Sequence, residues 1–268
     1  AASRSQRPDT AAMIRLEDIS LFYPDSGRTI LHGISWDIES GGRWVLFGPN
    51  GSGKTKLLEI ITGYLYPSGG SVRRFGSDGG ADIRDVRKRI GYLSTPLKDR
   101  FYRHERLIDV VVSGPYATVG LYDEPGPADY ERARGLLESA GLGGRSGQPF
   151  GTLSDGEKQK ALMLRAVMAG PDLLILDEPC MGLDLPSRED FLSSLESLFG
   201  GKEMSVIYVT HYVEEITPFF KNIFMLKNGG AWFCGGIEDG LTDGVISGLF
   251  GREISIATKD GRFYAIPG

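Results

Sequence analysis

The order of apolar and polar residues divides the chain into short segments of different character. Residues 14–21 alternate between apolar and polar side chains, which predicts a strand with one buried face. Residues 30–38 predict a second strand, antiparallel to the first. Shorter, uninterrupted apolar runs are typical of central strands that are buried on both faces. Such runs occupy residues 44–47, 173–176 and 206–209.

Helical and turn patterns lie between and after these runs. Two turn sequences, residues 227–230 and 259–262, are flanked by apolar triplets and predict β-hairpins. Parallel strands that alternate with helices, with antiparallel hairpins at the ends, predict an α/β domain. Charged helical pieces and turns are concentrated in residues 96–172, where we expect a helical subdomain. Helices are predicted over residues 56–64, 129–140 and 161–168.

Composition narrows the class of protein. The chain has 268 residues and a formal net charge of −5, so bulk positive charge does not attract it to nucleic acid. Two cysteines are too few for a disulfide framework, and no stretch approaches the ~18 apolar residues of a membrane-spanning helix. Residues 1–12 are small, polar and basic, which predicts a disordered leader, either artificial or left from a targeting segment.

A glycine-rich segment follows the first buried run directly. Residues 48–55 read GPNGSGKT and fit the pattern G-x-x-x-x-G-K-[ST] between a strand and a helix. Bare glycines let consecutive backbone N–H groups turn inward on phosphate oxygens, and the following helix adds the positive end of its dipole. Lys54 is expected to reach the β- and γ-phosphates, and the Thr55 hydroxyl to ligate Mg²⁺. The predicted loop consists of Gly48, Pro49, Asn50, Gly51, Ser52, Gly53, Lys54 and Thr55.

Two acids follow the apolar run 173–176. Ligands of open α/β sheets bind beyond the carboxyl ends of the strands, which is where Asp177 and Glu178 are expected. The end of the strand and Pro179 let both carboxylates approach one site from different angles. We expect Asp177 to hold Mg²⁺, directly or through water, and Glu178 to polarise the attacking water.

Two more segments carry candidate phosphate contacts. The run 206–209 leads into His211, and a histidine at a strand end can hydrogen-bond to a γ-phosphate. Ser154 and Glu157 form the pattern of a capping box at the start of a helix. The Ser154 hydroxyl and the N–H of Gly156 at that helix N-terminus are also suited to binding a phosphate.

Five motifs, in this order, resemble those of the ATP-binding cassette (ABC) ATPases. The resemblance extends from Met13 to the end of the chain and implies one ABC ATPase domain over residues 13–268. Its fold would be a P-loop NTPase core with a mainly parallel sheet, an antiparallel β edge and a helical subdomain. Residues 89–94 and 209–216 resemble stand-alone cassettes related to metal-chelate and molybdate import ATPases. The motifs are GPNGSGKT, LSDGE (153–157), LLILDEP (173–179), GLD (182–184) and TH (210–211).

The resemblance implies a mechanism with ATP and Mg²⁺ as cofactors. Two cassettes, identical or different, face head to tail, and each ATP lies between the phosphate loop of one and Ser154 and Gly156 of the other. Asp184 communicates across that interface, and Tyr23 matches the aromatic residue that stacks on adenine. The pair energises a separate membrane permease and binds at the cytoplasmic face of its membrane. That membrane would belong to an organelle if the leader is a targeting segment. Catalytic roles are implied for Glu178, His211 and Lys54.

Three features depart from the family pattern. Asp155 and Glu157 replace the usual glycine and glutamine of the signature, which is expected to bring two acids near the γ-phosphate. Thr95 stands where the family has a glutamine, and its hydroxyl is too short to span to Mg²⁺ as an amide does. Lys56 replaces a small hydroxyl residue after Thr55 and is expected to add positive charge at the nucleotide.

Two other functions compete with the transport hypothesis. A cassette ATPase that acts on nucleic acid or ribosomes is disfavoured, because such relatives usually carry two cassettes with a long charged linker or a coiled-coil insertion. This chain has one cassette and no sustained heptads. A regulatory module without catalysis is disfavoured by the intact Lys54, Asp177, Glu178 and His211.

Overall fold

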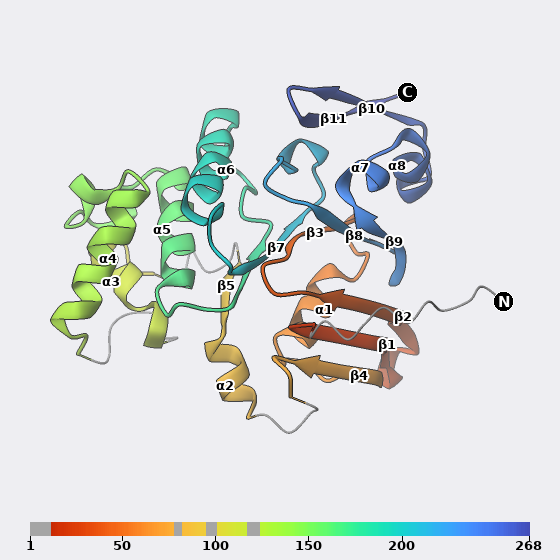
Figure 1. Cartoon of the computed structure of the whole chain (residues 1–268), viewed down its shortest axis with the longest axis horizontal. Helices are drawn as coiled ribbons and strands as arrows, with labels where there is room; N and C mark the ends of the chain where they lie inside the picture. Colours follow the sequence, from red (N-terminus) through yellow and green to blue (C-terminus); the bar gives the residue numbers. More distant parts are fainter. Residues whose placement is uncertain (1–11, 78–81, 95–100, 117–123) are drawn as a thin grey trace.

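A six-stranded sheet forms the centre of the molecule. The computed structural model describes residues 12–77, 82–94, 101–116 and 124–268 (Figure 1). The first five strands of the central sheet are parallel, and only the last pair is antiparallel, which confirms the predicted mainly parallel sheet. The strand order is β5 (Ile90–Ser94), β6 (Leu173–Asp177), β7 (Ser205–Thr210), β3 (Arg43–Phe47), β8 (Asn222–Lys227) and β9 (Gly230–Gly236).

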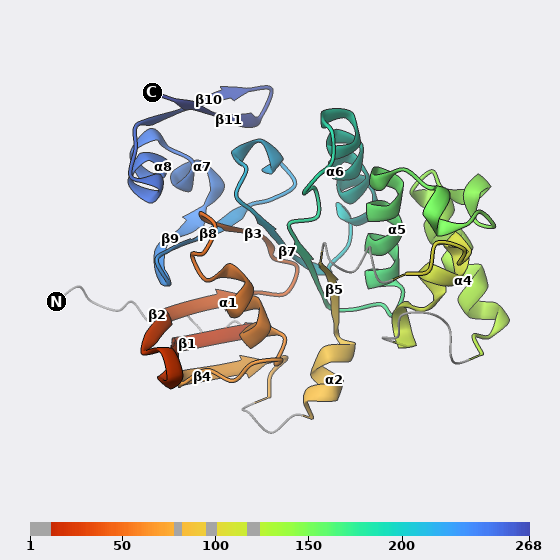
Figure 2. The same ribbon diagram turned by 180° about the vertical axis from the view of Figure 1, so that it is seen from behind.

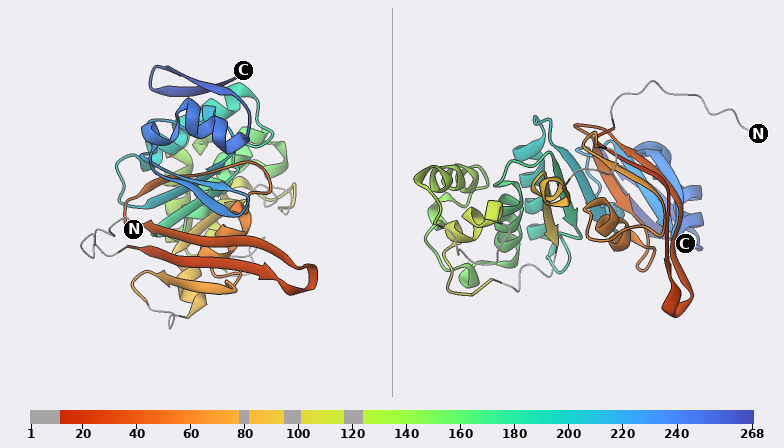
Figure 3. Two further views of the ribbon diagram at one scale, coloured as in Figure 1. Left: turned by 90° about the vertical axis from the view of Figure 1, so that its right-hand side faces the viewer. Right: turned by 90° about the horizontal axis from the view of Figure 1, so that it is seen from below.

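The predicted antiparallel edge is a separate three-stranded sheet. Its order is β2 (Arg28–Ile38), β1 (Ile14–Tyr23) and β4 (Gly69–Arg74). Trp36 of β2 stacks on Phe224 of β8 with ring centroids 4.6 Å apart, so this sheet packs its apolar face against the central one. The hairpin of β1 and β2 projects beyond the central sheet (Figure 3). β4 has no counterpart among the predicted elements, because its glycine-rich, mostly exposed sequence carries no strand pattern.

The helix after the phosphate loop begins and ends earlier than predicted. α1 spans Lys54–Ile61 rather than residues 56–64. It begins at Lys54 because the loop leads into the first turn directly, without a separate cap. It ends where Gly63 takes a left-handed conformation with a φ of 74°, and the N–H groups of Gly63 and Tyr64 donate back to the carbonyls of Ile60 and Glu59 at 3.1 and 2.8 Å.

Three helices form a layer at the end of the molecule that lies opposite the β1–β2–β4 sheet (Figures 1 and 2). α3 (Leu107–Val112), α4 (Pro127–Ser139) and α5 (Asp155–Val167) share one apolar core with α6 (Leu185–Phe199). The capping box predicted for α5 is present, since the N–H of Glu157 donates to Ser154 Oγ and the N–H of Ser154 donates to Glu157 Oε2. A subdomain boundary at residues 96 and 172 stays a prediction, and the predicted leader lies almost wholly outside the described residues.

Both predicted hairpins are present near the C-terminal end. β8 and β9 form one, and β10 (Ile254–Lys259) and β11 (Arg262–Pro267) form the other. Arg262 pairs with Glu189 of α6 at 2.9 and 3.2 Å, which fixes the second hairpin to the core. None of the helices that the structure describes is long and apolar enough to cross a bilayer. The remaining helices are α2 (Ile83–Lys88), α7 (Ile237–Gly240) and α8 (Asp243–Phe250).

Candidate functional site

The phosphate loop lies at the carboxyl end of the central strand β3. This strand pairs with β7 on one side and β8 on the other, so the loop emerges in the middle of the sheet. Gly48 has a φ of 152°, and a Cβ atom there would lie 2.4 Å from the carbonyl oxygen of Leu226. Only glycine fits this position, because a side chain would collide with rigid backbone. The predicted order of strand, loop and helix is therefore confirmed.

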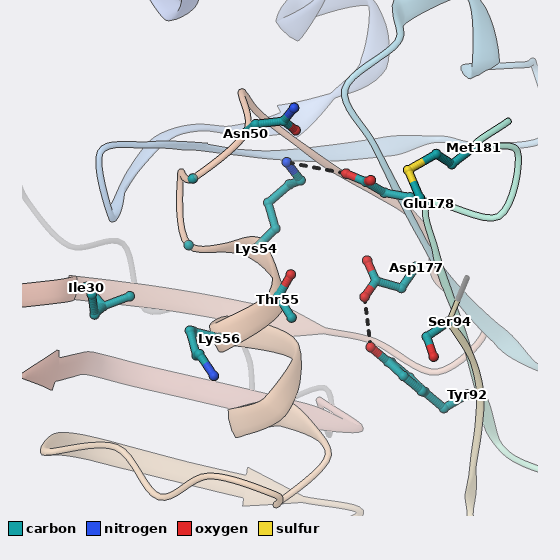
Figure 4. Close-up of a pocket in the computed structure, with 12 residues that line it drawn as sticks. Ile30, Asn50, Lys54, Thr55, Lys56, Tyr92, Ser94, Asp177, Glu178 and Met181 are labelled. Carbon is teal, nitrogen blue, oxygen red and sulfur yellow. Dashed lines mark hydrogen bonds and ion pairs between the residues drawn. The ribbon is translucent and has the colours of Figure 1, made fainter. Parts of the chain in front are cut away.

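Lys54 folds back over the loop from the first turn of α1. Its Nζ atom donates to the carbonyl oxygen of Gly48 at 2.8 Å and to that of Pro49 at 3.2 Å. The side chain is almost fully buried, and burial lowers the pKa of Lys54, while the nearby carboxylates of Glu178 and Asp177 raise it. Nζ lies 3.9 Å from Oε1 of Glu178 (Figure 4). The loop thus presents a buried cation next to its backbone.

Glu178 lies between Lys54 and His211. β6 and β7 are adjacent parallel strands, so the residues that follow them meet at the same edge of the sheet. The N–H of Glu178 donates to the carbonyl of Val209 at 3.1 Å, and its Oε1 lies 3.2 Å from Nδ1 of His211. The structure thus brings together Lys54, Glu178 and His211, the three residues to which the sequence assigned catalytic roles.

Asp177 lies beside Glu178 but faces a different neighbour. The hydroxyl of Tyr92 on β5 donates to its Oδ2 at 2.9 Å (Figure 4). Burial raises the pKa of Asp177, and the hydrogen bond from Tyr92 lowers it. Burial likewise raises the pKa of Tyr92, so its hydroxyl remains a donor at neutral pH. Tyr92 therefore orients a carboxylate that the sequence proposed as a metal ligand.

Lys54, Tyr92, Asp177 and Glu178 line one open pocket of about 650 Å³. Such a volume accommodates a nucleotide-sized ligand. Figure 4 shows Lys54 and Glu178 pointing toward each other across it, with Asp177 next to Tyr92. Among the residues described, Ser52 Oγ is a buried loop atom that lacks a hydrogen-bond partner. The pocket is lined by Ile30, Asn50, Gly51, Gly53, Lys54, Thr55, Lys56, Tyr92, Ser94, Asp177, Glu178 and Met181.

Eight residues predicted to contact nucleotide are not among those that line this pocket. They are Gly48, Pro49 and Ser52 of the phosphate loop, His211, Tyr23, Ser154, Gly156 and Asp184. Tyr23 is the last residue of β1 and is half-buried, and Ile30 of β2 lines the pocket instead. Ser154 and Gly156 are at the start of α5, where Ser154 is exposed. Asp184 is exposed and caps α6, accepting a hydrogen bond from the N–H of Ser187 at 2.9 Å. Hydrogen bonds from Ser187, first from its side chain and then from its backbone N–H, lower the pKa of Asp184.

The acids that depart from the family signature have basic neighbours. Glu157 Oε1 lies 3.1 Å from Nε of Arg145, and Asp155 Oδ1 lies 3.5 Å from Nζ of Lys158. Their charge is partly compensated within the chain, which reduces the repulsion of a phosphate that the sequence alone suggests.

The other two departures from the family pattern are Lys56 and Thr95. Nζ of Lys56 lies 2.7 Å from Oε2 of Glu59, and this hydrogen-bonded pair raises the pKa of Lys56. Its charge is thus shared with a carboxylate. Thr95 lies outside the described residues.

Sequence reasoning missed several residues that line the pocket. Tyr92 and Ser94 were noted only as part of a segment that resembles other cassettes. The sequence contains a usable signal for both. Tyr92 and Ser94 are two positions apart on β5, so their side chains lie on the same face of that strand, which leads toward the site. Met181 and Ile30 carry no such signal, since each belongs to a turn or strand without a motif. Ile30 is placed by the pairing of β2 with β1, and Met181 by the turn after β6, where its N–H donates to the carbonyl of Glu178 at 3.1 Å.

Comparisons with known proteins agree with this geometry. The family model described as "ABC transporter" matches residues 31–181. The ABC transporter ATP-binding protein YlmA of Bacillus subtilis (strain 168) is 38% identical over 253 residues, which cover 93% of this chain and 95% of that protein. An ABC transporter ATP-binding protein of Streptococcus mutans is 32% identical over 262 residues, covering 96% and 99%.

The fold agrees as well. The solved structure of an inward-facing, metal-chelate type ABC transporter superposes with a TM-score of 0.77 at 23% identity, covering 96% of this chain and 97% of that one. The family model spans more than half of the chain, and the relatives are similar along nearly all of it. The chain therefore belongs to the ABC transporter family, in which it is an ATP-binding ATPase subunit.

Proposed function

We propose that this subunit binds Mg²⁺-ATP in the pocket beside the phosphate loop and hydrolyses it with Glu178 as the residue that polarises water. The observation that carries the proposal is the position of Glu178 Oε1, 3.2 Å from His211 and 3.9 Å from Lys54. A carboxylate held between two potential phosphate contacts is suited to orienting a water for attack on the γ-phosphate.

The loop fits a phosphate chain on two grounds. First, the carbonyl oxygen of Leu226 leaves no room for a Cβ atom at Gly48, so the loop has no side chain there. A bare backbone is what a phosphate cradle requires. The partnerless Ser52 hydroxyl is a buried donor in the same loop of the described structure. Lys54 would exchange its two carbonyl contacts for phosphate oxygens, and the N-terminus of α1 would favour the same negative charge.

The donor set fits Mg²⁺. The Thr55 hydroxyl and the Asp177 carboxylate line one pocket, and Mg²⁺ in nucleotide sites prefers few protein oxygens together with phosphates and water. When bound, the ion would neutralise charge on the phosphates. The task of Tyr92 would be to keep Asp177 ionised and in place, while His211 would hydrogen-bond to the γ-phosphate.

We propose that a second cassette completes the site. Ser154, Gly156 and Asp184 are away from the pocket of their own chain, on the N-terminal ends of α5 and α6. A head-to-tail dimer would present these helix ends to the nucleotide of the other copy, where their N–H groups favour phosphate. Tyr23, beside Lys56, would lie at the adenine end of the same pocket.

We further propose that the dimer energises a separate membrane permease and binds at the cytoplasmic face of its membrane. The similarity to the ABC transporter ATP-binding protein YlmA, which covers 93% of this chain, supports a role in transport. The net charge of −5 disfavours a role on nucleic acid.

Dimer dependence tests this proposal. Phosphate release from Mg²⁺-ATP is measured over a dilution series, with light scattering on the same samples. We expect the rate per subunit to fall on dilution and ATP to promote dimers in wild type, while Ser154→Arg loses both without losing ADP binding. A rate per subunit that is independent of dilution and of Ser154 would contradict the shared site. Affinity purification from membranes then tests the permease, and recovery of ribosomes or nucleic acid instead would support the alternative.

A further inference from the structure

A buried polar network lies directly beneath the proposed catalytic residues. Its four side chains are almost fully buried, with exposed fractions between 0 and 4%. Buried polar groups of this kind are normally held by specific hydrogen bonds, because leaving one unpaired is costly. None of the four has a role in the proposed chemistry. They are Cys180, Tyr208, Thr210 and Glu215.

One oxygen of Glu215 is the centre of the network. Its Oε2 atom accepts a hydrogen bond from the hydroxyl of Tyr208 at 2.9 Å and one from the hydroxyl of Thr210 at 2.6 Å. Tyr208 also contacts Sγ of Cys180 at 3.3 Å. The N–H of Tyr212 donates to Oγ1 of Thr210 at 3.0 Å.

Counting protons fixes the direction of these bonds. A tyrosine hydroxyl has a single hydrogen, so Tyr208 can donate to only one of its two neighbours. An ionised carboxylate only accepts, and Tyr208 therefore donates to Glu215 and accepts from the thiol of Cys180. Burial raises the pKa of Cys180 to about 12, which keeps that thiol protonated. Oε2 of Glu215 thus accepts from both hydroxyls, which leaves the oxygen of Tyr208 to accept from the thiol of Cys180.

The network joins the two turns that carry the proposed catalytic groups. Cys180 is two residues after Glu178 on the turn that follows β6, and Thr210 is the last residue of β7, directly before His211. Glu215 lies at the end of the short helical turn Val213–Glu215, so its carboxylate bonds back to the strand that the chain has just left. The contact between Glu178 and His211 is therefore supported from below by side chains of both turns.

We propose that Glu215 is a positioning residue, which through Tyr208 and Thr210 sets the distance between Glu178 and His211. The inference rests on the proposed function, because it assigns Glu215 an effect on the same hydrolysis. Its specific requirement is an acceptor oxygen rather than a negative charge. Glutamine at this position can supply that oxygen, whereas methionine has a similar length and no acceptor.

The first test compares Glu215→Met with Glu215→Gln. We expect Glu215→Met to lower kcat by about tenfold or more with KM and ADP affinity within about twofold, the pattern of a group that acts in the transition state. Glu215→Gln should restore kcat to within about twofold of wild type. Tyr208→Phe, which keeps the ring and removes the hydroxyl, gives a second variant if Glu215→Met does not fold.

A matched control separates position from general stability. Ser113 is also fully buried, and its hydroxyl accepts from Nε of Arg165 at 3.0 Å in the helical layer. Ser113→Ala should lower the melting temperature by an amount similar to Tyr208→Phe, because each removes one buried hydroxyl, but it should leave kcat unchanged.

A readout without nucleotide follows His211 directly. The chain has three histidines, and the other two, His32 and His104, are exposed and provide internal references for imidazole NMR signals. In nucleotide-free protein we expect Glu215→Met and Tyr208→Phe to shift the His211 signals and Glu215→Gln to leave them in place. In a His211→Ala background, Glu215→Met should cause little further loss of kcat, since coupled residues are not additive.

Three outcomes would overturn the inference. They are wild-type kcat in Glu215→Met, equal losses in the glutamine and methionine variants, and unshifted His211 signals in the methionine variant. A wild-type protein that hydrolyses no ATP would instead contradict the proposed function, and the NMR comparison would still report whether Glu215 positions His211.

Discussion

Oε1 of Glu178 lies 3.2 Å from Nδ1 of His211, although the two residues are 33 positions apart in the chain. They meet because β6 and β7 are adjacent and parallel, so their carboxyl ends coincide. Glu178 reaches this position with a φ of 50°, in the left-handed region that residues other than glycine rarely adopt. Strained backbone of this kind is typical of functional sites.

The strain at Glu178 predicts a gain in stability when it is relieved. Glycine adopts positive φ without the clash of a Cβ, and the cost at other residues is roughly 1 kcal/mol. We expect Glu178→Gly to unfold at a higher urea concentration than Glu178→Gln, which lacks the charge but retains the Cβ. Identical midpoints for the two variants would argue against stored strain.

The phosphate loop should be far less tolerant at Gly48 than at Gly51. A Cβ at Gly48 meets the Leu226 carbonyl, whereas a Cβ at Gly51 meets nothing within 4 Å. Gly48→Ala should therefore weaken ATP binding by about tenfold or more, because a displacement of the loop is felt by every phosphate contact. Gly51→Ala adds only the cost of a positive φ. Isothermal calorimetry with ATP measures both, and equal affinities would contradict the proposed cradle.

Tyr92→Phe tests whether Asp177 serves the metal. The variant removes the hydrogen bond to Asp177 Oδ2 and keeps the ring. We expect half-maximal hydrolysis to need at least about tenfold more Mg²⁺, since orienting groups behind a metal ligand are worth about 10- to 100-fold in affinity. Tyr66→Phe is the matched control, because Tyr66 is 77% exposed. An unchanged Mg²⁺ requirement in Tyr92→Phe would remove Tyr92 from the site.

Glu215 should make stability depend on pH. Burial raises its pKa above the ordinary value of 4.5. A carboxyl whose pKa is raised by folding contributes stability that is complete below its unfolded pKa and is lost as the pH rises through the folded pKa. Glu215→Gln should therefore resist urea better than wild type at about pH 7.5, and this advantage should vanish toward pH 4.5. An advantage of the same size at both pH values would contradict the assignment.

The central strands and the residues at their ends could be predicted from the sequence. Apolar runs such as 44–47 and 173–176 must be buried on both faces, and the topology of parallel sheets then gathers the polar residues that follow them. Glu178 and His211 were found in this way, and Lys54 was found from the glycine-rich motif GPNGSGKT. Residues at the carboxyl ends of adjacent parallel strands lie close together whatever the details of side-chain packing in the core.

The sequence does not reveal the supporting residues. The Glu214–Glu215 pair appears as an acidic turn, and nothing local shows that Glu215 is buried while Glu214 accepts from the N–H of Ala265 on β11. The end of α1 was placed too late, although Gly63, which closes the helix in a left-handed conformation, is a local signal for that end. The contact of Glu214 with Ala265, by contrast, joins segments far apart in the chain.

The most direct test is the steady-state hydrolysis of Mg²⁺-ATP by Glu178→Gln, with ATP binding measured on the same preparation. Glutamine keeps the size of the side chain but cannot act as a base. We expect unchanged ATP affinity, accumulation of ATP-bound dimers and a loss of turnover of at least about a hundredfold. Turnover equal to that of the wild type would contradict the role of Glu178 and with it the proposed mechanism.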